Sequence, residues 1–267
     1  MATKVIALDA GHGLKTAGKQ TPDGIKEWTL NDKVRDKVVA MLKDYDVNFI
    51  FPDNDEGNVD EALSNRRTMY VNKKVDAAVS IHHNAYKGTW CTATGVEIYT
   101  DNNATAADKA LAAAIYERLV TNTGMKGRGI KKANWAVINQ NTVPAVLVEG
   151  GFMDNKKDHA VITSDAGQTA YAKAIADGLI EFLKLKKKAV TTTTKPATTT
   201  AETFMVKFKE DMNVRTGPGT KYEAVAICKK NYKYTIVDTT KVGTALWGKL
   251  KSGVGWVCIA AKYCTRV

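Results

Sequence analysis

The chain opens on a short apolar run that ends in a polar, glycine-containing motif, and residues 5–13 read VIALDAGHG. The four apolar residues before Asp9 predict a buried β-strand, with His12 lying just after it. In open α/β sheets, ligands bind just outside the carboxyl ends of the strands. This stretch therefore predicts an α/β domain in which His12 lies at the functional edge of the sheet.

Two later apolar runs end in a similar way. His82 follows the run VSI, and Glu149 follows the run VLV. Glu27 begins a stretch in which apolar residues recur at helical spacing, and the preceding loop, TPDG at residues 21–24, can bring it to the same edge. We therefore expect four polar side chains, including that of His12, to converge at one edge of the sheet.

These four side chains have the chemistry of a metal centre. Two imidazoles and one carboxylate are typical ligands of a catalytic Zn²⁺ ion that keeps one open position. We predict that His12, Glu27 and His82 bind one zinc ion, and that Glu149 works as the base on the attacking water. If the strand continues, His82 and His83 face opposite sides, so only one of them is expected to bind metal. We choose His82 because it comes first after the apolar run. The residues alone thus predict a zinc hydrolase that acts on a carbonyl group.

Each of these residues also has a structural interpretation. A single histidine after a strand is more often structural than a metal ligand. Glu27 is also explained as a favourable charge at a helix N-terminus, and Glu149 as a buried ion-pair partner. The hypothesis of a metal site therefore depends on the four residues together.

The rest of residues 1–186 alternates between strand and helix patterns. Strands are expected near residues 47–51, 77–81, 96–99 and 145–148, and helices near residues 30–41, 59–72, 107–119 and from 164 onward. Such alternation predicts an α/β fold with a mostly parallel, twisted sheet flanked by helices.

A second domain is expected beyond a low-complexity segment. Residues 187–203 are rich in threonine and have no apolar periodicity, which predicts a solvated linker. Residues 204–267 contain short strand patterns separated by turn residues, which predict a small all-β barrel.

The net charge of +11 is unevenly distributed along the chain. Residues 1–188 contain 26 Lys and Arg against 23 Asp and Glu, whereas residues 189–267 contain 13 against 5. A small domain this basic favours a polyanionic partner. Nucleic acid, anionic lipid and an anionic cell-wall polymer are all compatible with the charge, and so is simple solubility.

Hydropathy and cysteine usage indicate where the protein is made and whether it spans a membrane. No apolar stretch approaches the roughly 20 residues that span a bilayer, and the N-terminal run is too short for an export signal. The cysteines Cys91, Cys228, Cys258 and Cys264 form no C-x-x-C pair, which favours reduced thiols in a protein made in the cytoplasm. A disulfide among the last three is the alternative.

Four segments of the first domain carry a family resemblance. They are DAGHG at residues 9–13, Glu27, SIHHNA at residues 80–85 and EGGFMDN at residues 149–155. Their order and spacing resemble those of the zinc-dependent N-acetylmuramoyl-L-alanine amidases of the amidase-3 type, found in bacterial autolysins and phage endolysins. Asp154 departs from the pattern, since a hydroxyl residue often stands before the asparagine in that family.

The resemblance implies a substrate and residue roles. It implies zinc ligands at His12, Glu27 and His82, and a catalytic Glu149. The bond cleaved would be the amide between N-acetylmuramic acid and the L-alanine of the peptidoglycan stem peptide. Asn84 would position the ligand strand or contact the substrate.

The C-terminal region carries a second resemblance. DMNVRTGPG at residues 211–219 resembles the opening of bacterial SH3-type domains, and GVGWV at residues 253–257 resembles a closing strand. The resemblance implies binding to cell-wall peptide or cross-bridge. Trp247, Trp256 and Tyr222 are candidates for an aromatic wall-binding groove, although aromatic residues of so small a barrel also serve as its core.

Together these features predict a modular peptidoglycan amidase that acts on the cell wall of a Gram-positive host. Without a visible export signal, we favour a phage endolysin that is made in the host cytoplasm and reaches the wall after release, over a bacterial autolysin exported by another route. The expected partners are peptidoglycan and anionic wall polymers, not nucleic acid. The alternatives are a zinc endopeptidase that cleaves a different bond and a non-catalytic wall-binding protein.

Overall fold

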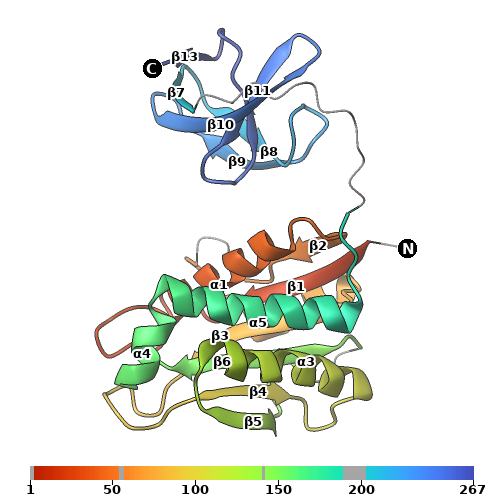
Figure 1. Cartoon of the computed structure of the whole chain (residues 1–267), viewed down its shortest axis with the longest axis vertical. Helices are drawn as coiled ribbons and strands as arrows, with labels where there is room; N and C mark the ends of the chain where they lie inside the picture. Colours follow the sequence, from red (N-terminus) through yellow and green to blue (C-terminus); the bar gives the residue numbers. More distant parts are fainter. Residues whose placement is uncertain (1–2, 54–56, 140–141, 189–202) are drawn as a thin grey trace. The chain divides into compact units, whose positions relative to one another are not determined.

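The computed structural model describes residues 3–53, 57–139, 142–188 and 203–267. The chain divides into two compact units, Met1–Ala189 and Val190–Val267 (Figure 1). The linker predicted at residues 187–203 lies almost entirely outside the described residues.

The first unit is built on a six-stranded sheet with the order β2-β1-β3-β6-β4-β5. The strands are β1 (Lys4–Ala10), β2 (Val47–Ile50), β3 (Ala77–Asn84), β4 (Val96–Thr100), β5 (Gly127–Lys132) and β6 (Ala145–Phe152). The first four in this order are parallel, whereas β4 is antiparallel to β6. The reversal at β4 was not predicted. The edge strand β5 was not predicted either, because it is mostly exposed and lacks an apolar pattern.

Helices cover both faces of this sheet, as the alternating pattern predicted. They are α1 (Glu27–Leu42), α2 (Leu63–Asn72), α3 (Ala106–Thr123), α4 (Lys156–Ile162) and α5 (Asp165–Leu183). Ile6 and Leu8 of β1 pack in the core beneath α1, α3 and α5, the helices in front of the sheet in Figure 1. Ala7, between them, belongs to the core on the other face, with Tyr70 of α2. This alternation makes β1 the buried strand that its sequence predicted.

The helix starts lie near the predicted positions, with one exception. α1 begins at Glu27, and Ser164 caps α5 by accepting a hydrogen bond from the Gly167 N–H. The exception is α2, which begins at Leu63 and not near residue 59. The reason is that residues 60–61 turn toward Arg66, whose guanidinium binds their polar groups.

The second unit is all-β, as predicted. Its strands are β7 (Phe204–Phe208), β8 (Met212–Arg215), β9 (Ala224–Cys228), β10 (Lys233–Val242), β11 (Ala245–Leu250), β12 (Trp256–Cys258) and β13 (Cys264–Arg266). They form one sheet with the order β13-β7-β10-β11-β12-β8-β9, and each neighbouring pair is antiparallel. Phe208, Ile236 and Val257 lie at the centre of its small apolar core.

Two further expectations concern membranes and cysteines. Over the described part of the chain, no helix is both long and apolar enough to span a membrane. Cys91, Cys228, Cys258 and Cys264 are all free thiols.

The loop after β3 is held by a buried carboxylate. Oδ2 of Asp154 accepts hydrogen bonds from the backbone N–H groups of Tyr86, Lys87 and Gly88 at 2.8, 2.8 and 3.0 Å. Burial acts to raise the pKa of Asp154, but these backbone hydrogen bonds outweigh it and lower the pKa below its ordinary value. A carboxylate suits three donors better than a hydroxyl group, which offers two lone pairs. The departure from the family pattern at this position thus has a local structural reason.

Replacing Asp154 by alanine is expected to lower the free energy of unfolding by about 1–3 kcal/mol, because the backbone N–H groups of Tyr86, Lys87 and Gly88 lose their charged acceptor. Because the folded-state pKa of Asp154 is depressed, its stabilisation is present above the ordinary pKa near 4 and is lost as the pH falls through the folded value. Urea unfolding of parent and Asp154→Asn should therefore differ at pH 7, and the difference should shrink as the pH falls below the ordinary pKa of Asp154. A difference that stays constant as the pH is lowered would contradict this role.

Candidate functional site

The structure brings the three predicted metal ligands together. One side-chain donor atom from each of His12, Glu27 and His82 lies within 4.8 Å of the other two. Glu27 lies between the two imidazoles, with Oε2 at 3.4 Å from His12 Nε2 and Oε1 at 3.2 Å from His82 Nδ1. The end of β1, the start of α1 and the end of β3 each supply one ligand, as the strand-end pattern predicted.

The donor set fits a zinc ion. A tetrahedral ion with bonds of about 2.0–2.1 Å separates its ligand atoms by roughly 3.3–3.4 Å. The two carboxylate oxygens of Glu27 each lie near this spacing from one histidine, Oε2 from His12 and Oε1 from His82. With one donor atom taken from each residue, the three atoms lie within 4.8 Å of one another. Two neutral imidazoles and a carboxylate are also ligands that zinc accepts in catalytic sites.

The protonation states favour cation binding. Burial lowers the pKa of His12 to about 4, so this imidazole is neutral at pH 7. Burial acts to raise the pKa of Glu27, but the hydrogen bond and charge of His82 outweigh it, so the pKa falls below its usual range. For His82, the bond to Glu27 outweighs burial and raises the pKa. A bound cation would replace the proton that His82 shares with Glu27.

The loop that carries His12 is under steric constraint. His12 has φ +67°, a left-handed conformation that costs energy for a residue other than glycine. Gly11 is required beside it, because a Cβ atom there would lie 2.1 Å from His82 Cε1. The absence of a side chain at Gly11 therefore gives the two histidines room to approach each other.

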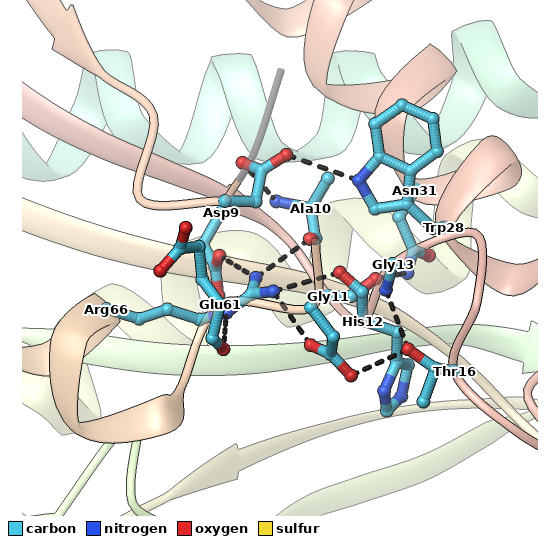
Figure 2. A network of polar contacts seen from close by, with 12 residues as sticks. Asp9, Ala10, Gly11, His12, Gly13, Thr16, Trp28, Asn31, Glu61 and Arg66 are labelled. Atoms are coloured by element: carbon cyan, nitrogen blue, oxygen red, sulfur yellow. Dashed lines mark hydrogen bonds and ion pairs between the residues drawn. The ribbon is translucent and has the colours of Figure 1, made fainter. Parts of the chain in front are cut away.

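Arg66 anchors this loop from α2 (Figure 2). Its guanidinium donates to the backbone oxygens of Ala10 at 3.0 Å, His12 at 2.9 Å and Glu61 at 3.0 Å, and it forms an ion pair with Asp9. Arg66 is only 1% exposed, so these bonds form away from water. Arg66 therefore holds the strained backbone of His12 in place.

Asp9 is connected to His82 through the hydroxyl group of Ser80. Ser80 donates its hydroxyl to Asp9 Oδ2 at 2.7 Å, and His82 Nε2 lies 3.2 Å from Ser80 Oγ. The other ring nitrogen of His82 faces Glu27. Such outer contacts fix the tautomer and ring orientation of a metal ligand. Sequence reasoning missed Ser80, although its position two residues before His82 places it on the same strand face.

His83 points to the other face of the sheet, as predicted. Its Nδ1 lies 2.8 Å from Asn31 Oδ1, and its ring meets that of Tyr171 edge-on. Its backbone N–H donates to Glu27 Oε1 at 3.2 Å, which helps to fix the carboxylate. His83 is therefore a buried structural neighbour of the site.

Glu149 lies beside these ligands. It is the register partner of His82 across β3 and β6, and its Oε2 is buried without a hydrogen-bond partner in the part of the chain that the structure describes. Burial raises the pKa of Glu149 to about 8. A cation held by the neighbouring ligands would favour its ionised form. The geometry thus presents an unengaged carboxylate next to the metal ligands.

Asn84 contacts protein groups. Its Nδ2 donates to Glu97 Oε1 at 2.7 Å, and its Oδ1 accepts from the Ala85 N–H at 2.9 Å. These contacts fit the first of its two predicted roles, positioning the end of β3. Substrate contact by Asn84 stays a prediction.

A cavity of about 310 Å³ opens next to the two histidines. Leu63, Arg66 and Val137 line it, together with the acidic residues Asp60 and Glu61. It lies on the α2 side of the site and gives a ligand access to the imidazoles.

The three aromatic residues predicted to bind cell wall do not share one groove. Trp247 is 4% exposed and lines a cavity of about 420 Å³ with residues that include Asn213 and Tyr263. Trp256 and Tyr222 do not line this cavity. Lys249 covers the ring of Trp256, and Tyr222 packs against glycines. A joint wall-binding role of the three stays a prediction.

Comparison with known proteins identifies the first unit. Residues 6–181 match the Amidase_3 family, described as N-acetylmuramoyl-L-alanine amidase. The chain is 33% identical to the endolysin of Bacillus phage SPP1, over 98% of both chains.

Solved structures give the same family. The catalytic domain of CwlV, an N-acetylmuramoyl-L-alanine amidase of Bacillus (Paenibacillus) polymyxa var. colistinus, superposes with TM-score 0.63 and 32% identity, over 68% of this chain and 99% of that one. An N-acetylmuramoyl-L-alanine amidase of Clostridium difficile 630 superposes with TM-score 0.64 and 28% identity, over 69% and 98%.

The family match covers the strands and helices that carry all four converging side chains. The chain therefore belongs to the Amidase_3 family of N-acetylmuramoyl-L-alanine amidases and is a peptidoglycan amidase.

Proposed function

We propose that this amidase is zinc-dependent, with His12, Glu27 and His82 as metal ligands and Glu149 as general base. The observation that carries the proposal is the convergence of three metal donors beside a buried carboxylate without a partner among the described residues. The bond cleaved is the amide between the lactyl group of N-acetylmuramic acid and L-alanine.

His12, Glu27 and His82 would bind the metal ion, and Glu149 would transfer protons. Zinc, when bound, polarises the scissile carbonyl and makes a water molecule more acidic. Glu149 takes a proton from the attacking water and transfers it to the alanine nitrogen as the C–N bond breaks. The products are a lactyl carboxylate and a stem peptide with a free amine. Oε2 of Glu149 has no hydrogen-bond partner among the described residues, so it is available for both transfers.

For the second unit we propose an SH3-type, cell-wall-binding role. The similarity to the endolysin of Bacillus phage SPP1 extends over 98% of this chain and so includes this unit, which supports the proposal. The excess of 13 basic over 5 acidic residues in residues 189–267 favours anionic wall polymers as additional partners.

We propose that the chain acts as a phage endolysin. The relative from Bacillus phage SPP1 bears that name and matches in length, which supports this assignment over a bacterial autolysin. In this role, the protein would be made in the host cytoplasm and act on the wall after release.

Glu149→Gln is expected to keep one zinc ion per chain and to lower the rate of amide cleavage by about 10²–10⁴-fold, because glutamine cannot accept the proton. Zinc is measured by elemental mass spectrometry, and cleavage by the release of amines from purified wall. His82→Ala is the matched control, and it should lose both zinc and activity.

The products of the same digestion distinguish the alternatives. The amidase should release L-alanine amino groups and leave the glycan without new reducing ends. New amines at cross-bridge residues would indicate an endopeptidase. Unchanged lysis by Glu149→Gln would contradict the proposed base, and parent protein without zinc would contradict the metal site.

Arg66→Met is expected to weaken zinc binding by about 10–100-fold, because the His12 loop and the chain from Asp9 to His82 lose their anchor. The free energy of unfolding should fall by about 3–5 kcal/mol, since Asp9 stays buried without its partner. Zinc affinity is measured by competition with a chelator. Arg118→Met is the control, because it removes an arginine from a solvent-exposed pair with Glu181. Parental zinc affinity in Arg66→Met would refute the anchoring role.

Removal of residues 189–267 should leave the zinc content intact, because all proposed ligands lie in the first unit. Binding to purified Gram-positive wall should weaken in a co-sedimentation assay. The full chain should lose part of its binding at 1 M salt, where the screening length is about 3 Å. Equal sedimentation of the full and shortened chains would exclude wall binding by the second unit.

A further inference from the structure

A second buried carboxylate lies next to Glu149 and gathers two cations. Glu97 of β4 is the register partner of Glu149 of β6 and is 2% exposed. Its carboxylate accepts a hydrogen bond from Arg128 Nε at 2.6 Å and from the Lys131 ammonium. The Tyr99 hydroxyl also donates to it at 2.8 Å. The edge strand β5 therefore contributes two cationic side chains beside the proposed base.

A bulge in the backbone aims both cations at the same face. β4 and β5 pair Val96 with Gly127 and Ile98 with Ile130, so Arg128 and Gly129 both lie opposite Glu97. In a regular strand, residues 128 and 131 would point to opposite faces. The extra residue shifts the alternation, and Gly129 permits it with φ +97°. The chain thus departs from regular pairing where the departure brings Arg128 and Lys131 together.

Both cations are held in place and yet remain open to a ligand. The Arg128 guanidinium lies 4.9 Å from the ring centre of Phe152, and its Nη1 donates to the Thr94 carbonyl at 3.3 Å. Its Nη2 has no hydrogen-bond partner among the residues that the structure describes. The side chains of Arg128 and Lys131 are 31% and 37% exposed. Donors that are pre-positioned in this way bind a carboxylate at a reduced entropy cost.

The charges on the two sides of Glu149 differ. Toward β5, two cations face the single negative charge of Glu97. Toward α2, the cavity beside the histidines carries the acidic groups of Asp60 and Glu61. An acidic ligand that extends from the scissile bond is therefore attracted toward β5 and repelled from the α2 side.

We propose that Arg128 and Lys131 form a subsite for a carboxylate of the stem peptide, one or two residues beyond the L-alanine. β6 and β5 are two strand spacings apart, or roughly 10 Å. An extended peptide advances about 3.3–3.6 Å per residue, so an acidic side chain at the second or third position reaches the cations. This subsite rests on the proposed amidase reaction and adds a preference for acidic stem peptides.

The test uses the full chain and two soluble muramoyl peptides that differ only in this carboxylate, which is free in one and amidated in the other. A charge-assisted contact with these two cations predicts that the zinc-loaded parent favours the free acid by about 10-fold or more in kcat/KM, mainly through KM. Arg128→Gln combined with Lys131→Met should bring the ratio of the two substrates to about one.

Lys132→Met is the matched control. Lys132 pairs with Thr100, one residue beyond the Tyr99–Lys131 pair, and so projects to the opposite face. The Lys132→Met variant removes one positive charge from β5, as Lys131→Met does. It should keep the parental ratio of kcat/KM between the two substrates. If the double variant loses its zinc, the single variants Lys131→Met and Lys131→Arg decide, since only the second should keep the preference.

Three results overturn the subsite. The parent cleaves both substrates equally well, or the zinc-loaded double variant retains the preference. The third result is that the substitutions weaken binding to a phosphate-containing wall polymer and leave the substrate ratio unchanged. Arg128 and Lys131 would then bind that polymer and not the stem peptide. A parent that cleaves neither substrate refutes the proposed amidase reaction itself.

Discussion

The site depends on one buried ion pair, between Arg66 of α2 and Asp9 of β1. Arg66 binds the backbone of the His12 loop, and Asp9 reaches His82 through the Ser80 hydroxyl. Both proposed histidine ligands are therefore oriented by the same pair of charges. A buried pair of this kind adds little net stability, but the loss of one partner is costly. Its value here is geometric, because it holds His12 in a left-handed conformation that isolated chains avoid.

Two nearby carboxylates, Glu27 at the start of α1 and Glu149 in β6, have pKa values shifted in opposite directions. Glu27 is surrounded by imidazoles and a backbone N–H, which keep its pKa low, whereas burial raises the pKa of Glu149 to about 8. A ligand should stay ionised, and a base should exchange protons near neutral pH. These environments suit the proposed roles of Glu27 as ligand and Glu149 as base. Glu97 differs again, because Arg128 and Lys131 outweigh its burial and lower its pKa.

Much of the site was predictable from local pattern. His12, His82 and Glu149 each follow an apolar run, and parallel strands bring their carboxyl ends to one edge. Arg66 and Ser80 lacked such a signal, because their partner Asp9 lies 57 and 71 residues away in the sequence. The edge strand β5 was missed because its sequence, GRGIKK, contains a single large apolar side chain, and that side chain is exposed. The aromatic residues of the second unit were grouped by type alone. Trp247 lines the cavity of about 420 Å³, whereas Trp256 and Tyr222 do not.

The sequence by itself determined the two-part organisation, the α/β and all-β classes and the identity of the four converging residues. It could do so because burial periodicity and strand-end position are local properties that a few neighbouring residues encode. Only the tertiary structure decided which charges meet: Arg66 with Asp9, and Arg128 and Lys131 with Glu97. These contacts depend on strand order, on the reversal at β4 and on a one-residue bulge. Such features arise from packing across the whole sheet, and no short stretch of the chain specifies them.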